Sequence, residues 1–158
     1  MRVLGIDPGT SVTGYGVVEY GNGTPGFGRL IECGVLRFPR HSSLPYRLME
    51  LHAGIVTLIK RHRPTALALE NAFYHKNVRT TLVLGHARGV VLLAAQQQAL
   101  IIAEYPPATV KKSVVGAGGA PKAQVAAMVA RLLRLKHAPR PSDAADGVAV
   151  ALTHIMRS

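Results

Sequence analysis

The chain has 158 residues, of which 48% are hydrophobic and 17% charged, a composition typical of one compact folded domain and not of a disordered chain. Its 19 Lys and Arg against 8 Asp and Glu give a formal net charge of +11, and such an excess commonly accompanies a polyanionic partner. The start of the sequence lacks the charged leader and apolar segment of an export signal, and the single cysteine, Cys33, cannot form an internal disulfide. We therefore expect a cytoplasmic protein with one domain over residues 1–158.

The first predicted elements form a β-hairpin with an acid at its mouth. The apolar run that begins at Val3 ends at Asp7, and Pro8-Gly9 then favours a turn. Residues 13–19 read as the returning strand. On this stretch alone, Asp7 is as well explained by stabilisation of its own turn as by a functional role.

The remaining elements alternate between strands and helices. Strands are predicted over 29–38, 65–69 (ending at Glu70) and 100–104, and helices over 44–61, 78–98, 108–115, 121–135 and 143–156, the last capped by Ser142. Residues 71–77 read as a loop. This order predicts an α/β fold with a five-stranded mixed sheet and helices on both faces.

The helix over 78–98 carries two glycines, Gly85 and Gly89, four residues apart. This spacing permits close approach of another helix, from the same subunit or from a second one. The apolar region 82–103 is interrupted by His86, Arg88 and three consecutive glutamines, so we expect no membrane span there.

Four of the eight acidic residues fall at the ends of predicted elements. Asp7 ends the first strand and Glu70 the fourth, while Asp143 and Asp146 lie three apart at the start of the last helix and share one face. If the first and fourth strands are neighbours, Asp7 and Glu70 project from the same edge, and the last helix could bring its aspartates over that edge. Taken singly, Asp143 and Asp146 are also explained by the helix dipole, and Glu70 as a surface acid.

Four converging carboxylates would need a cation, because two unit charges about 4 Å apart repel by about 1 kcal/mol in water and about 4 kcal/mol at an effective dielectric of about 20. Oxygen ligands favour Mg²⁺ or Mn²⁺, whereas the seven histidines show no zinc-type spacing. Two such ions at an acidic cluster in a basic protein are an arrangement that hydrolyses phosphodiesters.

The sequence resembles the RuvC family of Holliday-junction resolvases. The motifs that carry the resemblance span nearly the whole chain: GIDPGT (5–10), ENAF (70–73), KN (76–77), LGHARG (84–89), VK (110–111), VVG (114–116) and SDAADG (142–147). The resemblance implies an RNase H-like fold and a homodimeric endonuclease that resolves four-way DNA junctions by paired symmetric nicks, in homologous recombination and DNA repair. It also implies the RuvA–RuvB branch-migration complex as a partner.

Residue by residue, the resemblance places the family's acidic tetrad, which holds two Mg²⁺ or Mn²⁺ ions, at Asp7, Glu70, Asp143 and Asp146. The base-stacking aromatic corresponds to Phe73 and the functional lysines to Lys111 and Lys122. From the residues themselves, Lys76, near the start of the second helix, is expected to contact the DNA backbone. An aromatic packed under its loop and ordinary surface lysines remain the alternatives.

Two other function classes fit part of the sequence. Asp-x-Gly-Thr before a hairpin is also similar to the first phosphate loop of actin-like and sugar-kinase ATPases, but 158 residues leave no room for their second lobe. A non-catalytic basic DNA- or RNA-binding protein would account for the charge and leave the placed acids unexplained.

Overall fold

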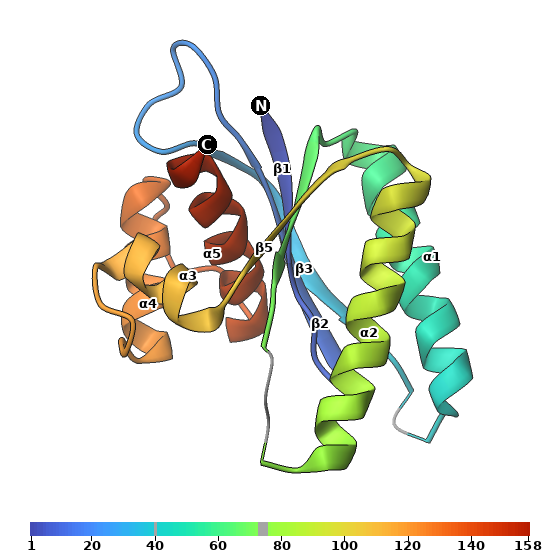
Figure 1. Cartoon of the computed structure of the whole chain (residues 1–158). Coiled ribbons are helices and arrows are strands. Elements are labelled where there is room, and N and C mark those ends of the chain that lie inside the picture. The colour runs from blue at the N-terminus through green and yellow to red at the C-terminus, as the bar shows by residue number, and fades with distance from the viewer. Residues whose placement is uncertain (40, 73–75) are drawn as a thin grey trace.

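The structure, a computed structural model, describes residues 1–39, 41–72 and 76–158. A central sheet lies between two helical layers, with two helices on one side and three on the other (Figure 1). The strands are β1 (Arg2–Asp7), β2 (Val12–Glu19), β3 (Arg29–Arg37), β4 (Ala66–Glu70) and β5 (Ile101–Tyr105). The helices are α1 (Leu44–His62), α2 (Val78–Gln97), α3 (Pro107–Val115), α4 (Lys122–Leu132) and α5 (Ser142–Arg157).

The five strands are ordered β3-β2-β1-β4-β5, with β1 antiparallel to β2 and parallel to β4. The predicted mixed sheet is therefore confirmed, as is the adjacency of the first and fourth strands. The parallel register places Ile6 beside Leu69, so the next residues, Asp7 and Glu70, leave the sheet at the same edge. This edge is the lower end of the sheet in Figure 1.

Each face of the sheet has its own apolar core. On one face, Leu4 and Ile6 pack with Leu51 and Ile55 of α1 and with Val91 of α2. On the other face, α5 supplies a nearly continuous buried surface that packs with α3 and α4. Because successive strand residues point to opposite faces, the strands read as short apolar runs and both faces are covered.

Glycines let α5 lie directly against β1 and β2. A Cβ atom on Gly147 of α5 would stand 2.5 Å from the Tyr15 Cα, and one on Gly16 of β2 would stand 2.6 Å from the Val148 Cα. Backbone atoms of α5 also block a side chain at Gly5 and Gly14. The absence of side chains at these four positions sets how closely the start of α5 approaches the sheet.

Three predicted helix starts are wrong by one residue; α3 begins at Pro107 instead of Ala108, and the other two are at α5 and α4. Ser142 is the first residue of α5 and not its cap; Pro141 occupies the cap position, with no side-chain hydrogen bond there. Pro121 likewise precedes α4 and does not begin it. In both cases proline's fixed φ suits the extended residue before the helix, and the sequence rule placed the boundary one residue away. The predicted helix over 121–135 also ends early, at Leu132.

By length and composition alone, α2 could cross a membrane, contrary to the expectation from sequence. The reason is that Arg79 and Arg88 are its only charged residues, and the apolar remainder outweighs them. In the structure α2 packs along α1, and Arg88 is paired with Glu104 of β5. Such pairing belongs to a helix held within a folded domain.

No described atom lies within 4 Å of a Cβ built on Gly85 or Gly89 of α2. Among the described residues, therefore, no helix of the same subunit uses this pair. Leu82 and Leu93 of the same helix are 60% and 53% exposed. The sequence left open whether a helix of the same subunit or of a second subunit approaches these glycines. In the described residues, no helix of the same subunit does.

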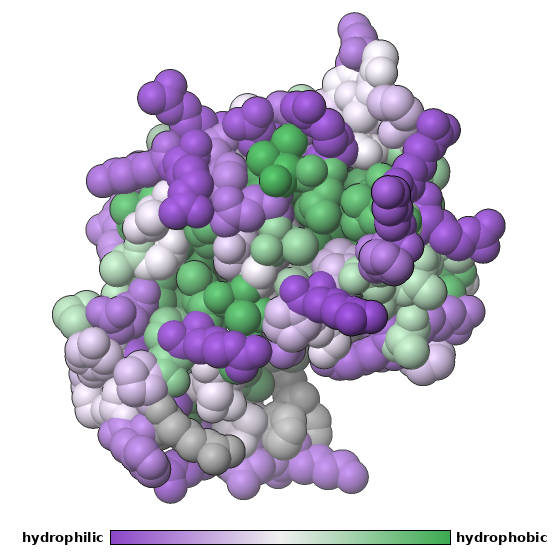
Figure 2. Space-filling model, turned by 180° about the vertical axis from the view of Figure 1, so that it is seen from behind, coloured by the Kyte–Doolittle hydropathy of each residue, from purple (hydrophilic) through white to green (hydrophobic). Residues whose placement is uncertain are grey.

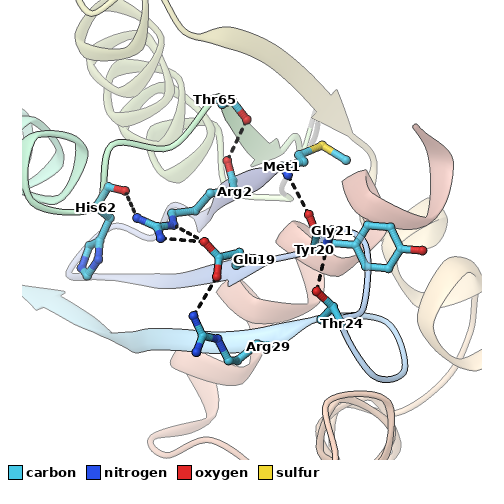
Figure 3. A network of polar contacts seen from close by, with 9 residues as sticks. All are labelled: Met1, Arg2, Glu19, Tyr20, Gly21, Thr24, Arg29, His62 and Thr65. Atoms are coloured by element: carbon cyan, nitrogen blue, oxygen red, sulfur yellow. Dashed lines mark hydrogen bonds and ion pairs between the residues drawn. The ribbon is translucent and has the colours of Figure 1, made fainter.

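The end of the sheet away from Asp7 is tied by polar contacts (Figure 3). The carboxylate of Glu19 accepts hydrogen bonds from Arg2, at 2.6 and 3.2 Å, and from Arg29, at 2.8 Å. The Glu19 group joins β1, β2 and β3 far from the acids described next.

Seen from behind, the surface shows apolar side chains in a band, with long hydrophilic side chains projecting around it (Figure 2).

Candidate active site

The structure brings the predicted acids together at one edge of the sheet. Asp7 and Glu70 end the neighbouring parallel strands β1 and β4, and the first turns of α5 carry Asp143 and Asp146 over them. Carboxylate oxygens of Asp7, Asp143 and Asp146 all lie within 4.8 Å of one another. Glu70 stands just outside this group and lines a cavity with Asp7 and Asp146.

Burial and mutual repulsion perturb these acids strongly. Desolvation, followed by the charges of Glu70 and Asp146, raises the pKa of Asp7 from 3.8 to about 8. Desolvation and the charge of Asp146 likewise raise the pKa of Glu70. The fold therefore holds carboxylates where their charged forms are unfavourable unless a cation is present.

Two lysines line the same cavity as the acids. Nζ of Lys122, the first residue of α4, lies 2.9 Å from Oδ2 of Asp146. This hydrogen bond is the main cause of a raised pKa at Lys122. Lys111 of α3 lines the cavity, and its charge, with that of Lys122, offsets part of the rise in the pKa of Glu70. A lysine at a helix N-terminus opposes the helix dipole, so the acids, and not the helix, account for the position of Lys122.

The donor set fits a hard divalent cation. Within the described ranges, the group of side chains able to hold a metal contains carboxylates only, without histidine or cysteine. Oxygen-only sites favour ions such as magnesium or manganese over zinc. The cavity beside them, lined by both lysines, leaves room for an anionic substrate next to the acids.

This site predicts a pH-dependent stabilisation by divalent metal. Because the folded-state pKa of Asp7 lies above its unfolded value, the metal-free fold loses stability as the pH rises from 3.8 towards about 8. A bound cation replaces the proton and offsets that loss. In thermal unfolding, Mg²⁺ should raise the melting temperature more at about pH 8 than at about pH 5. An equal shift at both pH values would contradict this explanation, and Asp7→Asn should reduce the shift at the higher pH.

Two predicted DNA-contacting residues remain, Lys76 and Phe73. Lys76 is exposed directly before Asn77, whose side chain caps α2 by accepting a hydrogen bond from the Thr80 amide. Phe73, predicted to stack on a base, lies outside the described residues.

A further polar group near the acids was missed by the sequence reading. Asn71, directly after Glu70, is 6% exposed and donates to Glu104 of β5, which also pairs with Arg88 of α2. Arg88 lies inside the quoted LGHARG motif, and Asn71 inside ENAF. The presence of Asn71 and Arg88 in two family motifs was the available signal that they have a role. No rule of spacing along the sequence predicts their contact with Glu104.

The family model described as "Crossover junction endodeoxyribonuclease RuvC" matches residues 3–154. The chain belongs to the RuvC family. Curated relatives of that name include one from Halorhodospira halophila, 50% identical, and one from Chloroflexus aurantiacus, 47% identical. These alignments cover 97% and 98% of this chain and 89% and 92% of the relatives. As a RuvC family member, the chain is a metal-dependent endodeoxyribonuclease.

Solved structures agree with this assignment. The chain superposes on Thermus thermophilus RuvC with a TM-score of 0.89 and 37% identity, over 99% of this chain and 94% of the other. The T. thermophilus RuvC complex with a Holliday junction substrate gives 0.87 and 34%, over the same shares of the two chains. The RNase H-like fold implied by the resemblance is thereby confirmed.

Proposed function

We propose that this chain resolves four-way DNA junctions in homologous recombination and repair, through paired nicks made at the acidic edge of the sheet. Family membership supports the reaction class, and the T. thermophilus RuvC structure with a Holliday junction supports the substrate. The observation that carries the proposal for this chain is the approach of the Asp7, Asp143 and Asp146 oxygens to within 4.8 Å beside two lysines.

In this proposal Asp7, Glu70, Asp143 and Asp146 hold two Mg²⁺ ions, with Mn²⁺ as an alternative. Bound divalent ions supply an activated water and stabilise the leaving oxygen of a phosphodiester. The chain itself contributes the placement of the carboxylates: two strand ends fix Asp7 and Glu70, and α5 adds the other two.

The basic residues hold the DNA. Lys111 and Lys122 line the same cavity as the acids, where each can bind a phosphate oxygen beside the scissile bond. Lys76 binds the backbone near the start of α2, and Phe73 stacks on a base at the crossover. With a net charge of +11, the rest of the surface adds binding that depends on salt and not on sequence.

The junction assay tests this function. A labelled four-way junction, a duplex and a single strand of the same sequences are incubated with the protein while Mg²⁺ and Mn²⁺ are varied. We expect metal-dependent cuts in opposed strands of the junction and little cutting of the duplex or single strand. Junction binding without a metal-dependent cut, over junctions of varied sequence, would instead indicate the non-catalytic binding protein.

We further propose a homodimer in which α2 packs against α2 of a second copy. The open positions at Gly85 and Gly89 and the exposed Leu82 and Leu93 support this surface. Two sites in one dimer also suit paired nicks. The RuvA–RuvB complex as a partner and a cytoplasmic location are proposed from the family's role on chromosomal DNA.

Substitution at Gly85 tests the dimer. A Cβ atom at Gly85 meets no described atom outside α2, so the fold should tolerate Gly85→Gln, while the longer side chain separates two closely packed helices. Sedimentation equilibrium at micromolar concentration should give a dimer mass for the wild type and a monomer mass for the variant. Gly21→Gln, also in open space, is the control and should remain dimeric. A monomeric wild type would refute the dimer.

A further inference from the structure

One carboxylate oxygen of Glu104 accepts three hydrogen bonds from two different elements. Asn71 Nδ2 donates to Glu104 Oε2 at 2.8 Å, and Arg88 donates to the same oxygen through Nε at 2.9 Å and through an Nη at 2.5 Å. The side chains of Glu104 and Arg88 are 29% and 37% exposed, so the pair is shielded only in part. The number of donors nevertheless fixes the carboxylate in one orientation.

These bonds hold the residue that follows Glu70. Glu104 is the neighbour of Leu69 in the parallel register, so its side chain shares the face of the sheet that α2 covers. Glu70 points to the opposite face, towards α5. Asn71 is held twice: its side chain by Glu104, and its backbone N–H by the Tyr105 carbonyl oxygen at 2.8 Å. Both the backbone and the side chain of the residue that follows Glu70 are therefore bound to β5.

The same carboxylate also accepts hydrogen bonds from Arg88, in the middle of α2. Arg88 projects from α2, and with Asp7 and Glu70 it lines a cavity on that side of the sheet edge. Glu104 thus joins Asn71, at the exit of β4, to Arg88 of α2 through one oxygen atom.

We propose that Glu104 is a positioning residue: acting through Asn71 and Arg88, it fixes the exit of β4 and the wall formed by α2, and so places Glu70 for cleavage of the junction. This rests on the proposed nuclease function. The competing explanation is an ion pair that only stabilises the β5–α2 contact.

Glu19 provides a matched control for that explanation. Like Glu104 it accepts three hydrogen bonds, two from one arginine, and its side chain is 32% exposed. It pairs with Arg2, at the end of β1 away from Asp7, and its contacts are those drawn in Figure 3. Loss of its carboxylate should affect stability without affecting the placement of Glu70.

The test compares Asn71→Ala, Glu104→Ala, Glu104→Gln and Glu19→Ala in the full chain. Three quantities are measured for each: the single-turnover cleavage rate at saturating enzyme, the junction dissociation constant without divalent metal, and the melting temperature. We expect Asn71→Ala and Glu104→Ala to slow cleavage by roughly 10- to 100-fold, the size of effect seen for residues that orient metal ligands. Junction affinity should change by less than about 3-fold. Glu104→Gln keeps an oxygen acceptor and should recover part of the rate.

Combination of the variants distinguishes positioning from stability. If Asn71 and Glu104 act through one contact, Asn71→Ala should add less than about 3-fold to the defect of Glu104→Ala. If the rate defects of Asn71→Ala and Glu104→Ala multiply in the double variant, the inference is overturned. It is also overturned if Glu19→Ala slows cleavage as much as Glu104→Ala does at a similar melting temperature. A wild-type protein that cuts no junction would instead refute the proposed function on which it rests.

Discussion

Asp7→Asn is expected to abolish junction cleavage while leaving junction binding intact. The substitution keeps the shape of the side chain but removes the most strongly perturbed carboxylate, whose pKa is raised to about 8 by burial and neighbouring acids. If Asp7 serves the metal and not the DNA, several kcal/mol of transition-state stabilisation are lost, which corresponds to a rate decrease of roughly 10³-fold or more. Removal of one negative charge should leave binding equal or slightly tighter.

The measurement pairs a cleavage time course with an electrophoretic mobility shift on the same junction. Glu50→Gln removes an exposed acid of α1 that lines neither cavity beside Asp7 and Glu70, and it should behave as the wild type in both assays. Loss of binding in parallel with cleavage would mean that Asp7 supports the DNA-bound fold in some other way, contrary to the proposed role.

The second large effect is expected from Gly147→Ala in α5. Alanine is favoured over glycine inside a helix by up to about 1 kcal/mol, so an unconstrained site would gain stability. Here the new methyl group would stand 2.5–2.6 Å from backbone atoms of Tyr15, and neither β2 nor α5 can move without loss of core packing. We expect a decrease of about 3 kcal/mol or more in the free energy of unfolding.

The displacement should also weaken metal binding, since α5 carries two of the four acids. Urea unfolding measures the stability, and Mn²⁺ binding to the DNA-free protein measures the site. Gly21→Ala, with no atom within 4 Å of the new Cβ, is the control and should alter neither. A Gly147→Ala variant as stable as the wild type would show that the close approach of α5 is not required.

Local patterns in the sequence were enough to predict the sheet and the positions of the acids at the ends of strands and of the last helix. The runs ending at Asp7 and Glu70 are short and apolar because both faces of β1 and β4 are covered, so each strand end was visible. The spacing of Asp143 and Asp146 placed them on one helix face. That β1 lies beside β4 was a condition of the argument, and only the pairing register established it.

Contacts between distant segments were beyond the reach of such patterns. Gly147 reads as an ordinary glycine in a helix until its contact with Tyr15, more than a hundred residues away, is known. Glu104 reads as an acid in a short strand, although it holds Asn71 and Arg88. Neither partner is fixed by helical or strand periodicity, because each contact depends on how the layers pack.

Anomalous X-ray scattering from crystals grown with Mn²⁺ would show whether acids from β1, β4 and α5 together hold divalent cations. We expect anomalous peaks within coordination distance of Asp7 and of at least one aspartate of α5, and their loss in the Asp7→Asn variant. Manganese bound only elsewhere on the protein, with none of these carboxylates as ligands, would contradict it.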